Sequence, residues 1–131
     1  MTGLDTNVLV RLFTRDDERQ LAQAKKLFAA LSADAPGWVS TVVLLELNWV
    51  LSSVYRCSKE QVLEIMELLL AMKEIVVEND EVIWRALRQW RGGKADFADC
   101  LITASARVAG CERTVTFDQR AARDAGMELL A

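Results

Sequence analysis

The sequence contains no histidine, and this absence removes the commonest general base of enzymes. Serine–histidine–aspartate and cysteine–histidine nucleophile systems are excluded with it, because both depend on an imidazole. Any hydrolysis by this chain has to use carboxylates, lysine or a metal ion. The cysteines Cys57, Cys100 and Cys111 are odd in number and form no close pair of the kind that zinc sites and thiol redox motifs need. We interpret them as free thiols that act as small apolar residues in or near the core.

Proline occurs once, and no apolar run is long enough to cross a bilayer. The first residues reach Asp5 without the basic stretch and apolar run of a secretory signal, so we expect neither secretion nor a membrane partner. A chain of 131 residues, about half of them apolar, has the size of one compact domain. We therefore expect a single domain over residues 1–131 in a cytoplasmic protein.

The formal net charge of −3 is unusual for a protein that binds nucleic acid, because phosphates are normally neutralised by a surplus of lysine and arginine. The objection is weak where several acids converge on a metal ion, since the cation reverses the sign of the local field. A nucleic-acid partner is therefore not excluded.

Short strand patterns alternate with helical patterns along the chain. This alternation predicts an α/β fold with a parallel sheet covered on both faces. The expected strands are residues 2–4, 37–40, 74–78, 114–117 and 127–130. Five helices are expected at residues 7–13, 42–54, 58–72, 97–109 and in a short segment after 118. Two more are expected to start at a capping residue: one is capped by Asp16 or Asp17 and runs to about 31, and the other is capped by Asn79 or Asp80 and ends at 92–93.

Two acids, Asp5 and Asp118, come at the predicted ends of strands. Open parallel sheets bind ligands beyond the carboxyl ends of their strands, so we expect both side chains to face one crevice. The alternative is that each aspartate only caps the helix that follows it.

Glu46 interrupts a strongly apolar helical segment, and its neighbours three and four residues away are Val42, Val43, Trp49 and Val50. A lone charge among such side chains is costly. We expect Glu46 to have a cation partner, a raised pKa or a water-filled cleft, which are features of functional sites. The alternative is a solvated surface position.

Asp96 and Asp99 lie three residues apart at the start of a predicted helix, so both side chains can project from one face. Asp96 as N-cap and Asp99 as its partner would form an arrangement like a capping box, without any ligand. For Asp99 we favour a role as a metal ligand.

Hard cations such as Mg²⁺ and Mn²⁺ prefer oxygen ligands, and four acids from separated segments suit them. One or two such ions can hydrolyse a phosphodiester without histidine.

The sequence resembles the PIN-domain nucleases, specifically the VapC-type toxins of toxin–antitoxin pairs. The resemblance covers nearly the whole chain and rests on residues 4–10 (LDTNVLV), 40–47 (STVVLLEL), 95–102 (ADFADCLI) and 116–118 (TFD). It implies that the catalytic metal cluster consists of Asp5, Glu46, Asp99 and Asp118, with Asp96 as an additional ligand found in one subgroup. It also implies that Thr6, Asn7 and Thr116 are polar neighbours that orient ligands or water.

The resemblance further implies a Rossmann-like sheet of five strands, cleavage of RNA that depends on Mg²⁺ or Mn²⁺, a homodimer, and inhibition by a cognate VapB-type antitoxin. Basic side chains that could grip the RNA backbone, or simply form solvated helix faces, are Arg11, Arg15, Arg85, Arg88, Arg91 and Lys94. Trp84 and Trp90 could stack on bases, although their helical spacing with apolar residues favours packing.

Two other functions stay open. A phosphatase of the haloacid dehalogenase type would use Asp5 as its nucleophile together with Mg²⁺, but it needs a second aspartate where this chain has Asn7. A PIN-like module that binds RNA or protein without cutting would keep the fold, although intact acids at all four positions disfavour it.

Overall fold

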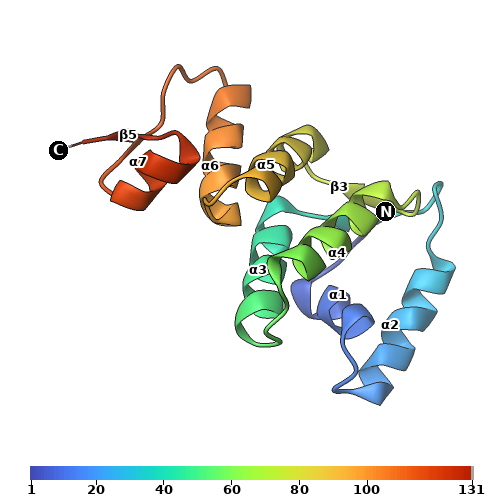
Figure 1. Ribbon diagram of the computed structural model, residues 1–131. Coiled ribbons are helices and arrows are strands. Elements are labelled where there is room, and N and C mark those ends of the chain that lie inside the picture. The colour runs from blue at the N-terminus through green and yellow to red at the C-terminus, as the bar shows by residue number, and fades with distance from the viewer. Residues whose placement is uncertain (131) are drawn as a thin grey trace. The chain divides into compact units, whose positions relative to one another are not determined.

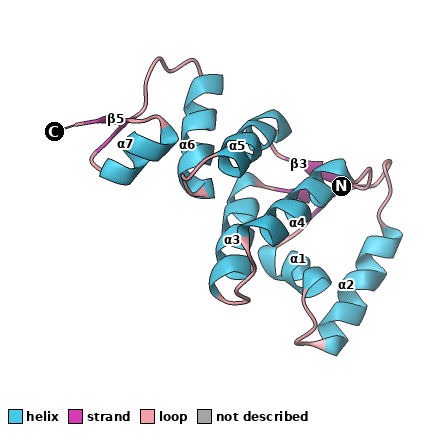
Figure 2. Ribbon diagram, in the orientation of Figure 1, coloured by secondary structure: helices cyan, strands magenta, loops and turns pink. Residues whose placement is uncertain are grey.

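The computed structural model describes residues 1–130. Over that range the chain forms seven helices and five short strands (Figures 1 and 2), which confirms the α/β class expected from the sequence. The residues divide into two compact units, Met1–Glu78 and Asn79–Ala131. Each unit has its own helices and its own parallel sheet.

The first unit holds the three strands that were expected in this part of the chain. Its elements are β1 (Thr2–Gly3), α1 (Thr6–Phe13), α2 (Glu18–Ala30), β2 (Gly37–Val39), α3 (Thr41–Ser53), α4 (Lys59–Ala71) and β3 (Ile75–Val77). Strand β2 lies in the middle and pairs in parallel with β1 and β3.

Gly37 begins the central strand at a point where an added side chain would require neighbouring apolar side chains to shift. A Cβ atom there would lie 2.8 Å from Cδ1 of Leu4 and 3.1 Å from Cδ1 of Ile75. Leu4 directly follows β1 and Ile75 begins β3, and both side chains are buried. The glycine therefore allows β1, which leads into Asp5, to lie closely against β2.

Side chains cap the starts of the helices in this unit. Asp17 rather than Asp16 caps α2, since its side chain accepts a hydrogen bond from the backbone N–H of Gln20. Ser58 caps α4 and forms a complete capping box with Gln61. Side-chain acceptors thus satisfy backbone donors that the first turn of a helix leaves unpaired.

The second unit holds the last two expected strands. Its elements are α5 (Asp80–Gly92), α6 (Phe97–Val108), β4 (Val115–Thr116), α7 (Gln119–Ala125) and β5 (Glu128–Leu129). Strands β4 and β5 pair in parallel. The five strands of residues 1–130 are thus divided into a sheet of three and a sheet of two, and each strand is only two or three residues long.

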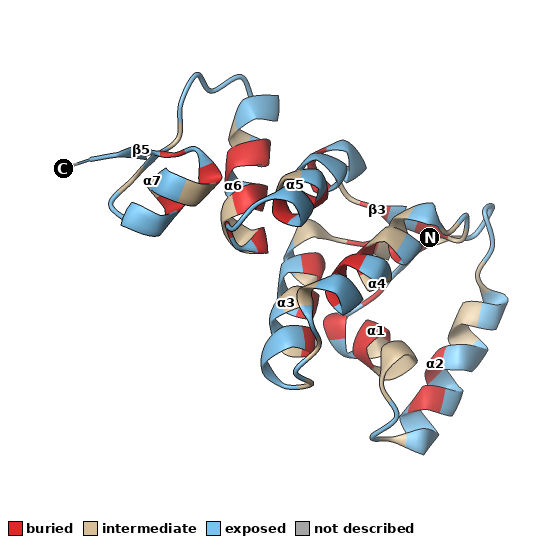
Figure 3. Cartoon of the chain, in the orientation of Figure 1, coloured by how far each residue is buried: buried red, intermediate tan, exposed pale blue. Residues whose placement is uncertain are grey.

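Helices α5 and α6 pack against each other and form most of the core of this unit (Figure 3). Ile83, Leu87 and Trp90 of α5 are buried, as are Phe97 and Leu101 of α6. Asn79 occupies the N-cap position of α5 in a left-handed conformation, but its side chain makes no capping hydrogen bond.

The expectation about the cysteines has a clear outcome. Cys100 is buried and Cys57 is half-buried, but Cys111 is exposed, so the expectation of a core position is wrong for Cys111, which lies in the turn after α6. None of the helices within residues 1–130 has the length and apolar character that crossing a bilayer requires.

Candidate functional site

Asp5 follows β1 and is the N-cap of α1. Its Oδ1 atom accepts a hydrogen bond from the backbone N–H of Thr6 at 2.7 Å. The capping role that the sequence left open is therefore real, yet the side chain is exposed and only Oδ1 is engaged within residues 1–130. A second carboxylate oxygen stays available for a ligand.

Glu46 lies on α3, and its surroundings differ from the sequence-based expectation. The buried side of the helix consists of Leu44, Leu47 and Leu51. Glu46 is exposed, and two of its helical neighbours, Val42 and Trp49, are 67% and 63% exposed. The sequence indicated apolar surroundings for this charge, but Glu46 lies on an exposed side of the helix, because the segment is apolar on all sides and its periodicity does not indicate which side faces inward.

A hydrogen bond joins Glu46 to the start of α1. The hydroxyl of Thr6 donates to Oε1 of Glu46 at 3.1 Å, and Thr6 itself is only 7% exposed. Because Thr6 is adjacent to Asp5, this bond places the glutamate carboxylate on the same side of the unit as the aspartate. The supporting position expected for Thr6 is consistent with this contact.

The same residues line one open cavity of about 330 Å³. Asp5, Thr6, Asn7 and Glu46 supply its polar lining, together with Arg11 and Tyr55. Glu46 therefore faces a cleft, one of the three environments that the sequence led us to expect for it. Tyr55 did not emerge from the sequence; its position directly after the helix that carries Glu46 was the only available signal.

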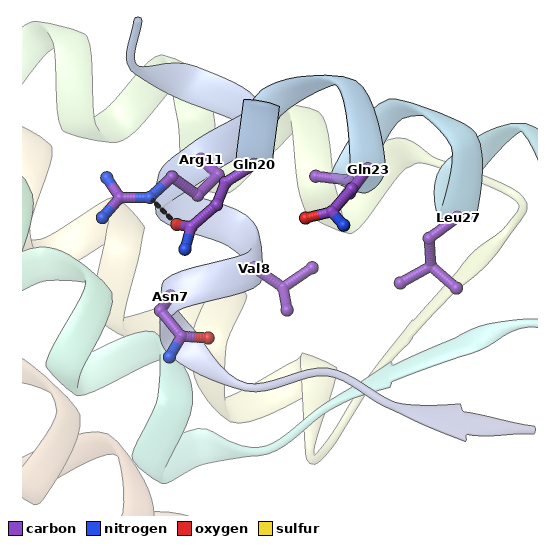
Figure 4. A pocket seen from close by; sticks show the side chains of 7 residues that line it. Asn7, Val8, Arg11, Gln20, Gln23 and Leu27 are labelled. Carbon is purple, nitrogen blue, oxygen red and sulfur yellow. Dashed lines mark hydrogen bonds between the residues drawn. The ribbon is translucent and has the colours of Figure 1, made fainter. Parts of the chain in front are cut away.

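A second hollow lies beside this one, between α1 and α2 (Figure 4). It has a volume of about 290 Å³, and its lining contains Asn7, Arg11, Gln20 and Gln23 but no acid. Arg11 donates to Gln20 Oε1 at 2.5 Å and forms an ion pair with Asp16 at 2.8 Å. With no carboxylate in its wall, this hollow lacks the ligands that a hard cation prefers.

The second unit brings three acids into one electrostatic environment. Asp96 is the N-cap of α6, and its Oδ1 accepts a hydrogen bond from the backbone N–H of Asp99 at 2.8 Å. Burial raises the pKa of Asp99 above its ordinary value, and the negative charges of Asp96 and Asp118 raise this pKa further. Asp99 is thus a half-buried carboxylate close to two others.

Asp118 follows β4 and caps α7. Its Oδ1 accepts hydrogen bonds from the backbone N–H groups of Arg120 at 2.8 Å and Ala121 at 3.4 Å. The hydroxyl oxygen of Thr116 accepts a hydrogen bond from the backbone N–H of Asp118 at 3.0 Å. Thr116 therefore helps to fix the backbone that presents Asp118.

The candidate ligands fall into two sets, Asp5 with Glu46 in the first unit and Asp96, Asp99 and Asp118 in the second. Within the part of the chain that the structure describes, no three acidic or cysteine side chains are grouped closely enough to hold a metal ion. The donors in both sets are all oxygen atoms, which is the chemistry that Mg²⁺ and Mn²⁺ prefer.

The tryptophans of α5 have different environments. Trp90 is 8% exposed, and its ring lies 5.4 Å from that of Phe97, so it belongs to the core, as its spacing indicated. Trp84 is exposed at the surface of the helix. Stacking on a base is therefore excluded for Trp90 in this conformation.

Comparison with known proteins gives three results. A model of the PIN domain family matches residues 4–126. The VapC ribonuclease of Aquifex aeolicus (strain VF5) is 28% identical over 121 residues, which cover 92% of this chain and 89% of that protein. The crystal structure of Mycobacterium tuberculosis VapC20, a sarcin–ricin loop cleaving toxin, aligns over 99% of this chain and 98% of its own, with 21% identity and a TM-score of 0.47.

Proposed function

The chain belongs to the PIN domain family, and from this membership we propose that it is a VapC-like endoribonuclease that hydrolyses RNA phosphodiester bonds with the help of Mg²⁺ or Mn²⁺. The family match extends over residues 4–126, which include parts of both compact units. We therefore propose that the two units together form one PIN domain. The same match favours the nuclease over the phosphatase hypothesis.

One observation carries the proposal. The hydrogen bond from Thr6 to Glu46 connects two motifs that are forty positions apart, and both motifs line a single cavity with Asp5. Packing alone does not need an exposed glutamate and an exposed aspartate on the wall of one hollow. An exposed pair of carboxylates in a cleft is well suited to bind a cation.

We propose that Asp5, Glu46, Asp99 and Asp118 hold the cation, with Asp96 as a further ligand. When bound, the cation supplies Lewis acidity toward the phosphodiester and makes a water molecule more acidic. Thr6 orients the carboxylate of Glu46, and Thr116 fixes the backbone of Asp118. Asn7, which lies on the wall of the same cavity, is available to orient substrate or water.

The biological setting follows from the same relationship. We propose that the chain acts as the toxin of a cytoplasmic toxin–antitoxin pair, that a cognate VapB-type antitoxin inhibits it, and that it forms a homodimer. The support is the similarity to a protein named VapC ribonuclease over nine-tenths of the chain. The free cysteines fit a reducing compartment.

The direct test is cleavage of total RNA by the purified chain with Mn²⁺ or Mg²⁺. We expect cleavage that stops when a chelator is added and that falls by at least about 100-fold in Asp5→Asn, because the variant keeps the shape of the side chain and loses its charge. Asp34→Asn provides a matched control, since Asp34 is exposed in the loop before β2 and belongs to neither set of acids.

Cleavage that persists in Asp5→Asn would refute a role for this carboxylate. A protein that is folded, binds RNA and never cuts it under any metal condition would instead be a binding module with a PIN fold. Light scattering of the same preparation measures whether the chain is a dimer.

A further inference from the structure

The two units differ in the kind of positive charge that they carry. Residues 1–78 contain eight basic and eleven acidic side chains, whereas residues 79–131 contain eight of each. Seven of the eight basic residues in the second unit are arginines, but only four of the eight in the first. Arginine binds phosphate groups through a planar, bidentate array of donors, so this bias is relevant to a nucleic-acid ligand.

Three of these arginines line one cavity. A hollow of about 240 Å³ between α5 and α6 is lined by Arg85, Arg88, Gln89, Ala104 and Arg107. Arg85 and Arg88 are three residues apart on α5, and therefore project from one side of that helix. Arg107 comes from the last turn of α6 and was not singled out by the sequence; its helical spacing from Asp99 was the only signal.

The positive charge of this cavity is only partly balanced. Arg85 forms an ion pair with Glu81 at 3.1 Å, and both side chains of that pair are largely exposed. Among residues 1–130, Arg88 and Arg107 have no acidic partner within ion-pair distance. Like charges that converge without counterions repel one another, and a bound anion relieves this repulsion.

The wall between the arginines is held in place by hydrogen bonds. The amide of Gln89 donates to the carbonyl of Ala125 at 3.2 Å, and its Oε1 accepts from the hydroxyl of Thr103 at 3.3 Å. Gln89 is therefore fixed between α6 and the end of α7. A fixed glutamine side chain among exposed arginine side chains is suited to a ligand of fixed geometry such as a phosphate.

We propose that Arg85, Arg88 and Arg107 bind a backbone phosphate of the RNA substrate, away from the bond that is cut. This inference rests on the proposed ribonuclease function. Asp99 and Arg107 are both on α6, and eight residues of helix correspond to roughly 12 Å along its axis. An RNA strand that reaches Asp99 can therefore place a phosphate a few nucleotides away at the arginine cavity.

The test is binding of a fluorescein-labelled RNA stem–loop, measured by anisotropy at several salt concentrations. The parent protein is the full chain with Asp5→Asn, in the presence of a chelator, so that binding is measured without cleavage. In the combined variant Arg88→Gln and Arg107→Gln we expect the Kd to rise by about 10–100-fold. The slope of log Kd against log salt should fall by roughly 0.7–0.9, since the neutralisation of one phosphate is lost.

Two further variants separate specific contacts from net charge. Arg19→Gln with Lys25→Gln removes the same charge from exposed positions of α2, and should change the slope much less. Arg88→Lys with Arg107→Lys keeps the charge and loses the bidentate geometry, so we expect an intermediate Kd. Circular dichroism checks that each variant is folded.

An unchanged Kd and slope in the glutamine double variant, or equal losses in the α2 control, would overturn the inference. So would a parent protein that does not bind the labelled RNA. Failure of the proposed nuclease is detected separately, by the metal-dependent cleavage assay on the wild-type chain. If the variants lose RNA binding as expected but the wild-type chain never cuts RNA, the phosphate site is supported and the catalytic proposal is refuted.

Discussion

The hydroxyl of Thr6 donates a hydrogen bond to Oε1 of Glu46 at 3.1 Å, although forty positions of sequence separate the two residues. Thr6 is nearly buried and is fixed as the first residue of α1, whereas Glu46 is exposed on α3. The buried residue therefore restrains the exposed one. This restraint keeps a long glutamate side chain at the wall of the cavity that Asp5 also lines.

Replacing Thr6 by valine should weaken metal binding while largely preserving the fold. Valine has nearly the same shape but cannot donate to Glu46, so the carboxylate loses its restraint. We expect the affinity for Mn²⁺ and the rate of RNA cleavage to fall by about 10–100-fold, as is usual when a residue that orients a ligand is lost. The free energy of unfolding should fall by only about 1 kcal/mol. Titration calorimetry and urea unfolding measure the two effects.

The matched control is Thr6→Ser, which keeps the hydroxyl group and should restore most of the metal affinity. If serine and valine reduced the affinity equally, the hydrogen bond would have no part in positioning Glu46.

Replacing Asp99 by asparagine should stabilise the metal-free protein. Burial raises the pKa of Asp99, and the charges of Asp96 and Asp118 add to this effect, so the ionised form is disfavoured in the folded state. The neutral amide removes that repulsion, and we expect a rise in Tm on the order of 2 °C without metal. Addition of Mn²⁺ should reverse the order of the two proteins, because a ligand stabilises the form that binds it better.

Differential scanning calorimetry with chelator and with Mn²⁺ compares the two proteins. A lower Tm for Asp99→Asn in chelator would show that the carboxylate has a stabilising structural partner.

The elements of the fold are largely predictable from local sequence signals, because caps and glycines act over a few residues. Ser58 and Asp17 lie where the helices begin, and Gly110 follows the end of α6 with a φ of 94°. Each strand is shorter than predicted by one or more residues, since a strand ends where its partner ends and the partner is distant in sequence.

The burial of side chains on α3 is not predictable in this way. The segment around Glu46 is apolar on every side, so its pattern has no preferred face, and only the packing of Leu44, Leu47 and Leu51 selects the inner side. The environment of Arg11 is likewise not predictable from its own segment. Its contacts with Asp16 and Tyr55 depend on the loops after α1 and α3, and they give the guanidinium a structural role that its helical position does not indicate.

Replacing Tyr55 by phenylalanine should reduce the part of the pH dependence of folding stability that comes from Asp16. The Tyr55 hydroxyl donates to Oδ2 of Asp16 at 2.6 Å, and this bond, followed by the charge of Arg11, lowers the pKa of Asp16 below its ordinary value of 3.8. A lowered pKa stabilises the fold at pH values above 3.8, and this stabilisation is lost as the pH falls through the lowered value. Wild type and Tyr55→Phe should therefore differ in stability near neutral pH and converge in acid.

Urea unfolding at a series of pH values between neutrality and the acid range measures this difference. A difference that stays constant down to the lowest pH would mean that Tyr55 stabilises the loop by packing and not through Asp16.

Two substitutions can separate the helix-capping role of Asp96 from its proposed role as a metal ligand. Serine is a good N-cap residue, so Asp96→Ser can still accept the hydrogen bond from the backbone N–H of Asp99, whereas Asp96→Ala cannot. We expect the alanine variant to lose about 1 kcal/mol of unfolding free energy and the serine variant to remain within about 0.5 kcal/mol of wild type. Both variants lack the carboxylate, so both should bind Mn²⁺ more weakly by a similar factor if Asp96 is a ligand. If Asp96→Ser has the Mn²⁺ affinity and the stability of the wild type, Asp96 caps α6 and is not a metal ligand.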